Sequence, residues 1–337
     1  MKISKYILIM LILLCILTVN YSYKTIKPRI GSRDGSANGI QNNNEAGGEQ
    51  RVEPADPADS PMVKGEMIFG DNYGVINKTV ADVYRFASRE SERVTQCLFN
   101  QPVEILEQTG EWAMVKVVDG YTGWILNDCI DMDCSSIQQC NYEFKIVISG
   151  MTKKIYDSPN GQDVLTDVTI GTQLYSAHKQ ADWYEVALPE GKIGWIDGNG
   201  TIETAADSDI ETKTAADFVA TLNSFIGTKY LWGGVSPYGA DCSGLTYICG
   251  RVNGIDLPRD AQPQFLYIKQ SVNKGDLKTG DLVFFNSEKD LNSISHVGVY
   301  IGEDHFIHAS KSAGKVVISS TKSDYFQKRF AGARRIF

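Results

Sequence analysis

The chain has 337 residues, of which 42% are hydrophobic and 22% are charged, so it can bury apolar cores and is not disordered throughout. This length suits about two or three domains. The formal charge of −8 argues against a nucleic acid partner, because phosphate binding needs clustered lysine and arginine.

A short apolar run follows two lysines at the N-terminus. Lys2 and Lys5 precede residues 7–19, which carry no charge. A helix of that length rises about 20 Å, less than the ~30 Å of a bilayer core. We therefore expect a secretory signal peptide over residues 1–22, with an uncleaved anchor as the alternative. After cleavage we expect no stable membrane span, and a mature chain in the periplasm or outside the cell.

Residues 23–62 are rich in Asn, Gly, Glu, Pro and Asp and nearly empty of large apolar side chains. Such a segment cannot bury enough surface to offset the entropy of ordering it. The composition therefore predicts a disordered linker that tethers the domains of the chain.

Four of the seven cysteines are grouped in the middle of the chain: Cys97, Cys129, Cys134 and Cys140. Export would permit them to form disulfides, in any of three connectivities, and free buried thiols are the alternative. Their spacing matches no familiar zinc pattern, so we expect no metal. Cys249 follows Cys242 by seven residues on a predicted helix and is expected in the core.

The middle of the chain contains an internal repeat. Two segments align without gaps at an offset of 71 residues, so that Trp124 corresponds to Trp195. Each copy has short apolar strands broken by a glycine-containing turn, the pattern of a small antiparallel barrel. Both copies end in Gly-x-x-Gly-Trp-Ile, which resembles the bacterial SH3 domain. This resemblance implies tandem SH3-like domains over residues 63–133 and 141–200.

One position of the repeat differs in a useful way. Tyr121 of the first copy corresponds to Lys192 of the second. The barrel therefore does not need an aromatic residue there, and Tyr121 is free for another role. An ordinary surface tyrosine on a turn is the alternative.

The segment after Gly239 is predicted to begin a helix at Cys242. Leu245, Ile248 and Val252 recur after it at helical steps. Unpaired amides and the helix dipole at this position favour a thiolate, so we expect a lowered pKa for Cys242. A thiolate is the form of cysteine that attacks a carbonyl carbon.

A nucleophilic cysteine needs a base, and the chain has four histidines: His178, His296, His305 and His308. His296 opens an alternating strand, and His308 lies in the next one. With a three-residue loop at 302–304, His308 falls opposite Gly298 and on the face of His296, where it would orient that imidazole. Gly298 would leave room for the ring. His178 lies away from this region, and His305 is expected to be solvated.

Six motifs follow one another in the C-terminal third: Tyr230-x-Trp-Gly-Gly, Asp241-Cys-Ser-Gly, Leu257-Pro-Arg-Asp, Gly280-Asp-Leu-Val-Phe-Phe, Ser295-His-Val-Gly-Val-Tyr-Ile-Gly and His308-Ala-Ser. In this order they resemble the NlpC/P60 family of cell-wall peptidases, which have a papain-like α+β fold. The resemblance covers residues 211–337. It implies Cys242 as nucleophile, His296 as base and His308 as the orienting residue. It also implies that Tyr230 and the Cys242 amide hold the oxyanion.

Barrels followed by this catalytic domain are similar to the γ-D-glutamyl-L-diamino acid endopeptidases. Their substrates are peptidoglycan-derived peptides with a free N-terminal L-Ala. The similarity implies that the amine is held by Asp241, Ser243 and Tyr121, with Arg259 and Asp260 lining the same pocket. Asp241 as helix N-cap is the alternative for that residue. At Gln101, where relatives can carry an acidic residue, this chain departs from the pattern, which weakens the expected free-amine requirement.

The sequence thus predicts an exported cysteine endopeptidase that cuts the γ-D-Glu–diamino acid bond and needs no cofactor. Two other readings share its features. A cell-wall amidase or acyl transferase would use the same Cys-His chemistry up to the acyl-enzyme. An idle cell-wall binding protein is the third reading, and retention of Cys242, His296 and His308 together argues against it. The diamino acid and the oligomeric state stay open.

Overall fold

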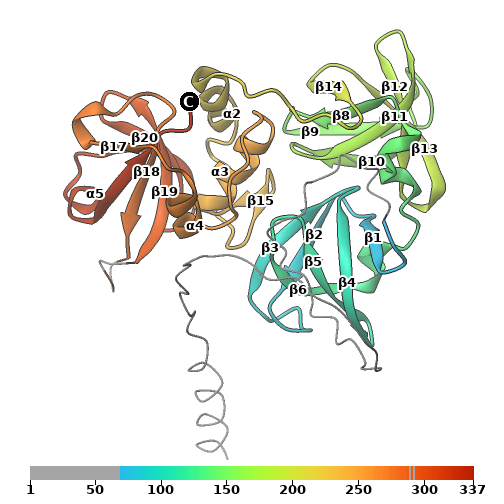
Figure 1. Cartoon of the computed structure of the whole chain (residues 1–337), viewed down its shortest axis with the longest axis horizontal. Coiled ribbons are helices and arrows are strands. Elements are labelled where there is room, and N and C mark those ends of the chain that lie inside the picture. The colour runs from blue at the N-terminus through green and yellow to red at the C-terminus, as the bar shows by residue number, and fades with distance from the viewer. Residues whose placement is uncertain (1–68, 288–289, 291–292) are drawn as a thin grey trace, which may run out of the picture. The chain divides into compact units, whose positions relative to one another are not determined.

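We describe a computed structural model in which residues 69–337 are placed, apart from 288–289 and 291–292. The predicted signal peptide and linker, residues 1–22 and 23–62, lie outside these described residues. The described chain forms two seven-stranded sheets, a six-stranded sheet and a two-stranded ribbon (Figure 1). This combination of sheets with a few helices is the predicted α+β class.

The first sheet has the strand order β3-β2-β6-β5-β4-β1-β7. Its strands are β1 (Tyr73–Ile76), β2 (Val80–Tyr84), β3 (Arg93–Leu98), β4 (Pro102–Thr109), β5 (Trp112–Val117), β6 (Thr122–Leu126) and β7 (Ile130–Asp131). Alternating side chains of these strands enclose an apolar core that includes Val83, Val115 and Ile125. All three are fully buried, as the two-residue period of a strand requires.

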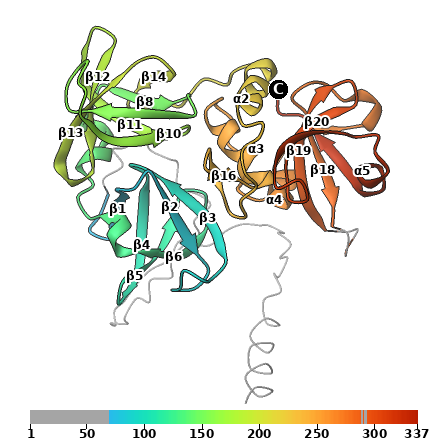
Figure 2. The same cartoon turned by 180° about the vertical axis from the view of Figure 1, so that it is seen from behind.

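The second sheet repeats this order strand for strand, as β10-β9-β13-β12-β11-β8-β14 (Figure 2). Its strands are β8 (Phe144–Ile148), β9 (Thr152–Tyr156), β10 (Val164–Thr169), β11 (Gln173–Gln180), β12 (Trp183–Leu188), β13 (Lys192–Asp197) and β14 (Thr201–Ala205). The sequence repeat is therefore confirmed as a repeat of topology. Its own core contains Ile155, Val186 and Ile196.

The glycines shared by the two repeats have a physical cause. Gly120 and Gly191 have φ angles of +88° and +64°, a region that side chains with a Cβ rarely adopt. A Cβ on Gly123 would lie 2.7 Å from the carbonyl oxygen of Tyr84, so β6 must have glycine where it crosses β2. In the second barrel a Cβ on Gly194 would meet side chains instead, with Ile155 Cγ2 at 2.4 Å.

The C-terminal domain packs helices against the six-stranded sheet, whose order is β17-β22-β18-β19-β20-β21. The strands of this sheet are β17 (Ser271–Val272), β18 (Leu282–Asn286), β19 (Ile294–Gly302), β20 (His305–Ser310), β21 (Lys315–Ser320) and β22 (Phe330–Arg334). Strands β15 (Val235–Ser236) and β16 (Gly239–Ala240) form the two-stranded ribbon. The helices of the C-terminal domain are α2 (Ala215–Ser224), α3 (Cys242–Arg251), α4 (Ala261–Tyr267) and α5 (Asp324–Arg329). Figure 1 shows α3 and α4 beside β19.

Helix α3 is central to this domain because its apolar side chains meet both the sheet and a barrel. Leu245, Ile248 and Cys249 are fully buried in one cluster with residues of β18–β20, so the core position predicted for Cys249 is confirmed. On the second barrel, a Cβ on Gly171 would collide with Ile248. Each fully buried leucine or isoleucine contributes about 1.5–3 kcal/mol, so this packing holds α3 against the sheet and the barrel.

All six cysteines of the described residues are free thiols, so the predicted disulfides are not formed in this structure. Cys97 and Cys134 are buried, while Cys140 is exposed. Within the same residues, no cluster of His, Cys, Asp and Glu is placed to hold a metal ion. No helix found there has both the length and the apolar character needed to cross a bilayer.

Candidate active site

Cys242 is the first residue of α3, as the sequence predicted. Asp241 is the N-cap, and its side chain accepts a hydrogen bond from the Gly244 amide at 2.7 Å. Cys242 is 8% exposed, and the backbone amides of Val297 and Ser243 face its sulfur closely enough to favour the thiolate. Since Val297 follows His296 directly, these contacts bring the sulfur beside the start of β19.

The predicted lowering of the Cys242 pKa is wrong for this structure. Burial, and then the Asp241 carboxylate, raise the pKa of the Cys242 thiol to about 12, although the two amides and Arg259 lower it. Burial lowers the pKa of His296 to about 4. Burial thus disfavours the charged forms of both the thiol and the imidazole, and for Cys242 this desolvation outweighs the helix terminus.

His296 and His308 lie against each other on neighbouring strands. The two ring nitrogens His296 Nε2 and His308 Nδ1 are 2.7 Å apart. The strands pair Val299 with Ile307 and Tyr300 with Phe306, so His308 falls opposite Gly298 as predicted. Gly302 pairs with His305, which makes the turn two residues rather than three, and a bulge before Gly302 restores the register.

Two further details of this pair were not foreseen. A Cβ on Gly298 would lie 2.5 Å from the Phe306 ring and 2.8 Å from the Ile307 carbonyl oxygen, so this glycine makes room for β20 and not for an imidazole. The other ring nitrogen of His308, Nε2, is 2.9 Å from Ser319 Oγ on β21. Burial, and then the neighbouring His296, lower the pKa of His308 to about 3.

Asp241 forms a buried ion pair that the sequence did not reveal. Arg259, only 2% exposed, donates from Nη2 to Asp241 Oδ2 at 2.7 Å and from Nη1 to Oδ1 at 3.0 Å. The Gly233 amide also donates to Oδ2, at 2.8 Å. Burial disfavours the charged form of Arg259, but Asp241 outweighs this and raises the pKa of the guanidinium. The N-cap role of Asp241 is therefore confirmed, and the same residue lines the cleft.

The first barrel contacts Arg259 through Thr95 and contacts Asp260 through Tyr121. Arg259 Nε donates to Thr95 Oγ1 at 3.2 Å, and that hydroxyl donates to Asp119 Oδ2 at 2.8 Å. The Tyr121 hydroxyl donates to Asp260 Oδ2. Burial, followed by Asp260, raises the pKa of Tyr121. The tyrosine that the second repeat lacks is thus joined to the catalytic domain.

A cleft of about 390 Å³ brings most of the predicted residues together. Those among its lining residues are Tyr121, Asp241, Cys242, Ser243 and Asp260. Arg259 does not line the cleft itself, but its Nη1 donates to Ser243 Oγ, a lining residue, at 3.2 Å. Tyr230 is half-buried and forms a β-bridge with Ala240, two residues before Cys242. Burial and then Cys242 raise the pKa of its hydroxyl. His178 and His305 are exposed elsewhere, as expected.

Two residues of the cleft were missed from the sequence. Glu92 accepts a hydrogen bond from Trp232 Nε1 at 2.9 Å and another from Arg85 at 2.7 Å. Trp232 lies in the Tyr-x-Trp-Gly-Gly motif, which was a usable signal, whereas nothing in the sequence singles out Glu92. The significance given to Gln101 is wrong: it is buried, accepts from the Leu98 amide at 3.0 Å and does not line this cleft.

Comparisons with known proteins identify the family of the chain. The sequence model of the NlpC/P60 family matches residues 227–335, and that of the bacterial dipeptidyl-peptidase SH3 domain matches residues 83–130. The chain belongs to the NlpC/P60 family of cell-wall peptidases and is a hydrolase with an SH3-like domain before a papain-like catalytic domain.

Particular relatives share most of the chain's length. A γ-D-glutamyl-L-lysine dipeptidyl-peptidase of Bacillus cereus is 30% identical over 72% of this chain and 74% of its own. A protein of the same name from Bacillus subtilis is 29% identical over 72% of this chain and 81% of its own. The crystal structure of an NlpC/P60 family protein from Bacillus cereus is 26% identical, with a TM-score of 0.70 over 78% of this chain and 99% of that one.

Proposed function

We propose that the chain is an exported cysteine endopeptidase that hydrolyses the γ-D-Glu–diamino acid bond of peptidoglycan peptides with a free N-terminal L-Ala. The observation that carries this proposal is the distance of 2.7 Å between the imidazoles of His296 and His308, on strands β19 and β20 that pack against α3, whose first residue is Cys242. The names of the two Bacillus relatives support the substrate class. The apolar N-terminal run supports export.

In the proposed reaction, His296 takes the thiol proton as Cys242 attacks the carbonyl carbon of the γ-glutamyl bond. The accepting atom is His296 Nδ1, because Nε2 is turned to His308. His296 therefore carries its proton on Nε2 and donates to His308 Nδ1, while His308 donates from Nε2 to Ser319. This chain of hydrogen bonds fixes the tautomer, which is the task of the third member of a triad.

Protonated His296 then gives its proton to the departing amine, and the acyl group stays on Cys242. Water attacks the acyl-enzyme with His296 as base, which releases the dipeptide and regenerates the thiol. The oxyanion is held by the Cys242 amide and the Tyr230 hydroxyl. That hydroxyl stays protonated because its pKa is raised, so it is able to donate.

The free amine of the substrate is proposed to lie near Tyr121, Ser243 and Asp260. Asp241 accepts five hydrogen bonds in this structure and has little capacity left for an ammonium group. Asp260 accepts one from Tyr121, and the tyrosine oxygen itself keeps its lone pairs. Asp241 therefore contributes to the pocket mainly through its ion pair with Arg259, and not as a direct ligand of the amine.

The proposal is tested with L-Ala-γ-D-Glu-L-Lys, offered with a free and with an acetylated N-terminus. We expect L-Ala-D-Glu from the free peptide alone, released by the wild type and not by Cys242→Ala. Tyr121→Phe is expected to raise KM for the free peptide more than for the blocked one. Cleavage of both peptides would discard the amine pocket. Cleavage of neither would favour an amidase, a transferase or a binding protein.

A further inference from the structure

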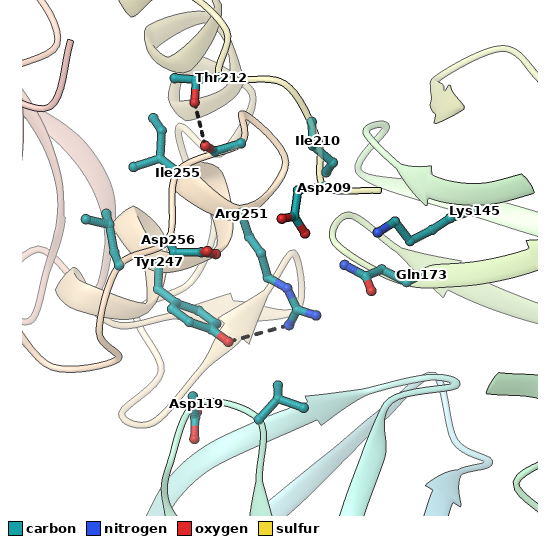
Figure 3. Close-up of a pocket in the computed structure, with 13 residues that line it drawn as sticks. Asp119, Lys145, Gln173, Asp209, Ile210, Thr212, Tyr247, Arg251, Ile255 and Asp256 are labelled. Atoms are coloured by element: carbon teal, nitrogen blue, oxygen red, sulfur yellow. Dashed lines mark hydrogen bonds between the residues drawn. The ribbon is translucent and has the colours of Figure 1, made fainter. Parts of the chain in front are cut away.

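A second cavity of about 600 Å³ lies apart from the cleft of Cys242 and shares none of its lining residues (Figure 3). We name it the junction cavity because both barrels, the segment before α2 and helix α3 contribute to it. Its charged lining residues are Asp119, Lys145, Asp209, Arg251 and Asp256. Its size is in the range of small-molecule sites, about 300–1,000 Å³.

Lys145 of β8 is an unpartnered cation in its wall. The residue is 7% exposed, and its ammonium group has no hydrogen bond or ion pair among the described residues. Figure 3 shows the Lys145 nitrogen and the Gln173 amide pointing into the cavity. Burial lowers the pKa of Lys145, and Asp209 and Asp207 oppose this. The ammonium nitrogen is not among the buried polar atoms that lack a partner, so solvent reaches it, and an anionic group in the cavity could reach it too.

Arg251, the last residue of α3, is the second cation. Its Nη1 donates to the Tyr247 hydroxyl at 3.4 Å, and no carboxylate of the described chain lies within ion-pair distance of it. A guanidinium has five N–H donors, so most of its capacity is open to a ligand. Two cations that face one cavity are suited to a carboxylate group.

The carboxylates of the cavity are not paired with these cations. Asp119 is already engaged, since it accepts from the Thr95 hydroxyl at 2.8 Å and the Tyr121 amide at 3.0 Å. Asp209 and Asp256 are exposed and have no hydrogen bond or ion pair within the part of the chain that is placed. The cations Lys145 and Arg251 and the carboxylates Asp209 and Asp256 therefore line the same cavity without forming ion pairs with one another.

We propose that the junction cavity binds a zwitterion, namely a free amino acid or short peptide. Its carboxylate is held by Lys145 and Arg251, and its ammonium group by Asp209 and Asp256. A simple anion would be repelled by the two aspartates, and a simple cation by Lys145 and Arg251. A zwitterion satisfies both pairs at once.

Calorimetric titration of the purified full chain with L-alanyl-L-alanine tests this site, because the dipeptide has no γ-glutamyl bond and is not consumed. We expect saturable binding that Lys145→Met weakens about tenfold or more, since a charge-assisted hydrogen bond is lost. Asp256→Asn, at an exposed position that folding tolerates, is expected to weaken it several-fold. Lys154→Met, at an exposed lysine of the same barrel, should leave it unchanged.

Separate titrations with propionate and inorganic phosphate distinguish a zwitterion site from an anion site. Both are expected to bind at least tenfold more weakly than the dipeptide. Equal binding of either anion, unaffected by Asp256→Asn, would overturn the proposal. So would dipeptide binding that Lys145→Met leaves unchanged. Because Tyr121→Phe alters only the catalytic cleft, loss of binding in that variant alone would assign the dipeptide to the cleft and also refute the junction site.

Discussion

Replacing Asp241 by asparagine separates the two tasks of this side chain at the start of α3. Asparagine caps a helix about as well as aspartate, so the bond to the Gly244 amide survives. The charge that pairs with Arg259 is lost. The new amide nitrogen would also face two donors, the Gly233 amide and Arg259 Nη2, which lie 2.8 and 2.7 Å from the present Oδ2.

The expected cost follows from burial. Arg259 is 2% exposed, and removing one partner of a buried ion pair costs about 3–5 kcal/mol because the other charge stays buried. In a chain of this size, 1 kcal/mol lowers Tm by about 2–4 °C, so Asp241→Asn should lower Tm by about 6–20 °C. Loss of the aspartate charge should also lower the pKa of Cys242, since Asp241 now raises it.

Thermal unfolding followed by fluorescence measures the first effect, and the pH dependence of Cys242 alkylation measures the second. Asp281→Asn is the control, because Asp281 is also buried and accepts from Arg335 at 2.7 and 2.8 Å, outside the catalytic cleft. It should lower Tm without moving the alkylation profile. A Tm loss below about 2 °C in Asp241→Asn would refute the ion-pair reasoning.

Three further outcomes are expected. Because the pKa of His296 is lowered to about 4, kcat/KM for the tripeptide should stay level down to about pH 4 and fall below it as the base is protonated; an acid limb near 6.5 would contradict this. Gly123→Ala should cost about 1–3 kcal/mol in chemical denaturation, whereas Gly275→Ala, whose added Cβ meets nothing within 4 Å, should not. Ser319→Ala should lower kcat several-fold at unchanged KM, because His308 loses its partner; a change in KM alone would assign Ser319 to substrate binding.

The repeat was predictable because its spacing is local. Glycine at Gly120 and Gly123 is required by a turn and by a close strand crossing. The turn recurs 71 residues later at Gly191, and Gly194 again has no room for a Cβ, there because of the Ile155 side chain. The start of α3 was predictable for a similar reason, since helical spacing and a capping aspartate lie within a few residues of each other.

The position of His308 opposite Gly298 was predicted correctly, although the predicted length of the turn before it was wrong. A three-residue loop and a two-residue turn with a bulge both place His308 opposite Gly298. The bulge could not be read from the sequence, because it depends on how the strands pair and not on local composition. The true role of Gly298, which gives room to Phe306, depends on the same pairing.

The pKa shifts and the ion pair of the site could not be predicted from the sequence. A helix terminus favours a thiolate, but the depth at which Cys242 is buried decides the sign of its pKa shift, and burial is a property of the whole fold. The pairing of Arg259 with Asp241 and its bond to Thr95 join the catalytic domain to the first barrel. Glu92 enters the cleft from that barrel without any motif to mark it.

The most direct test of the account is to find which residue carries the acyl group. Wild-type enzyme is mixed with L-Ala-γ-D-Glu-L-Lys, quenched in acid during the first turnover, digested and analysed by mass spectrometry. The account predicts a peptide that contains Cys242 and has gained the mass of one L-alanyl-γ-D-glutamyl group, absent in His296→Ala. Turnover with no acyl group on Cys242, or with the group on another residue, would contradict it.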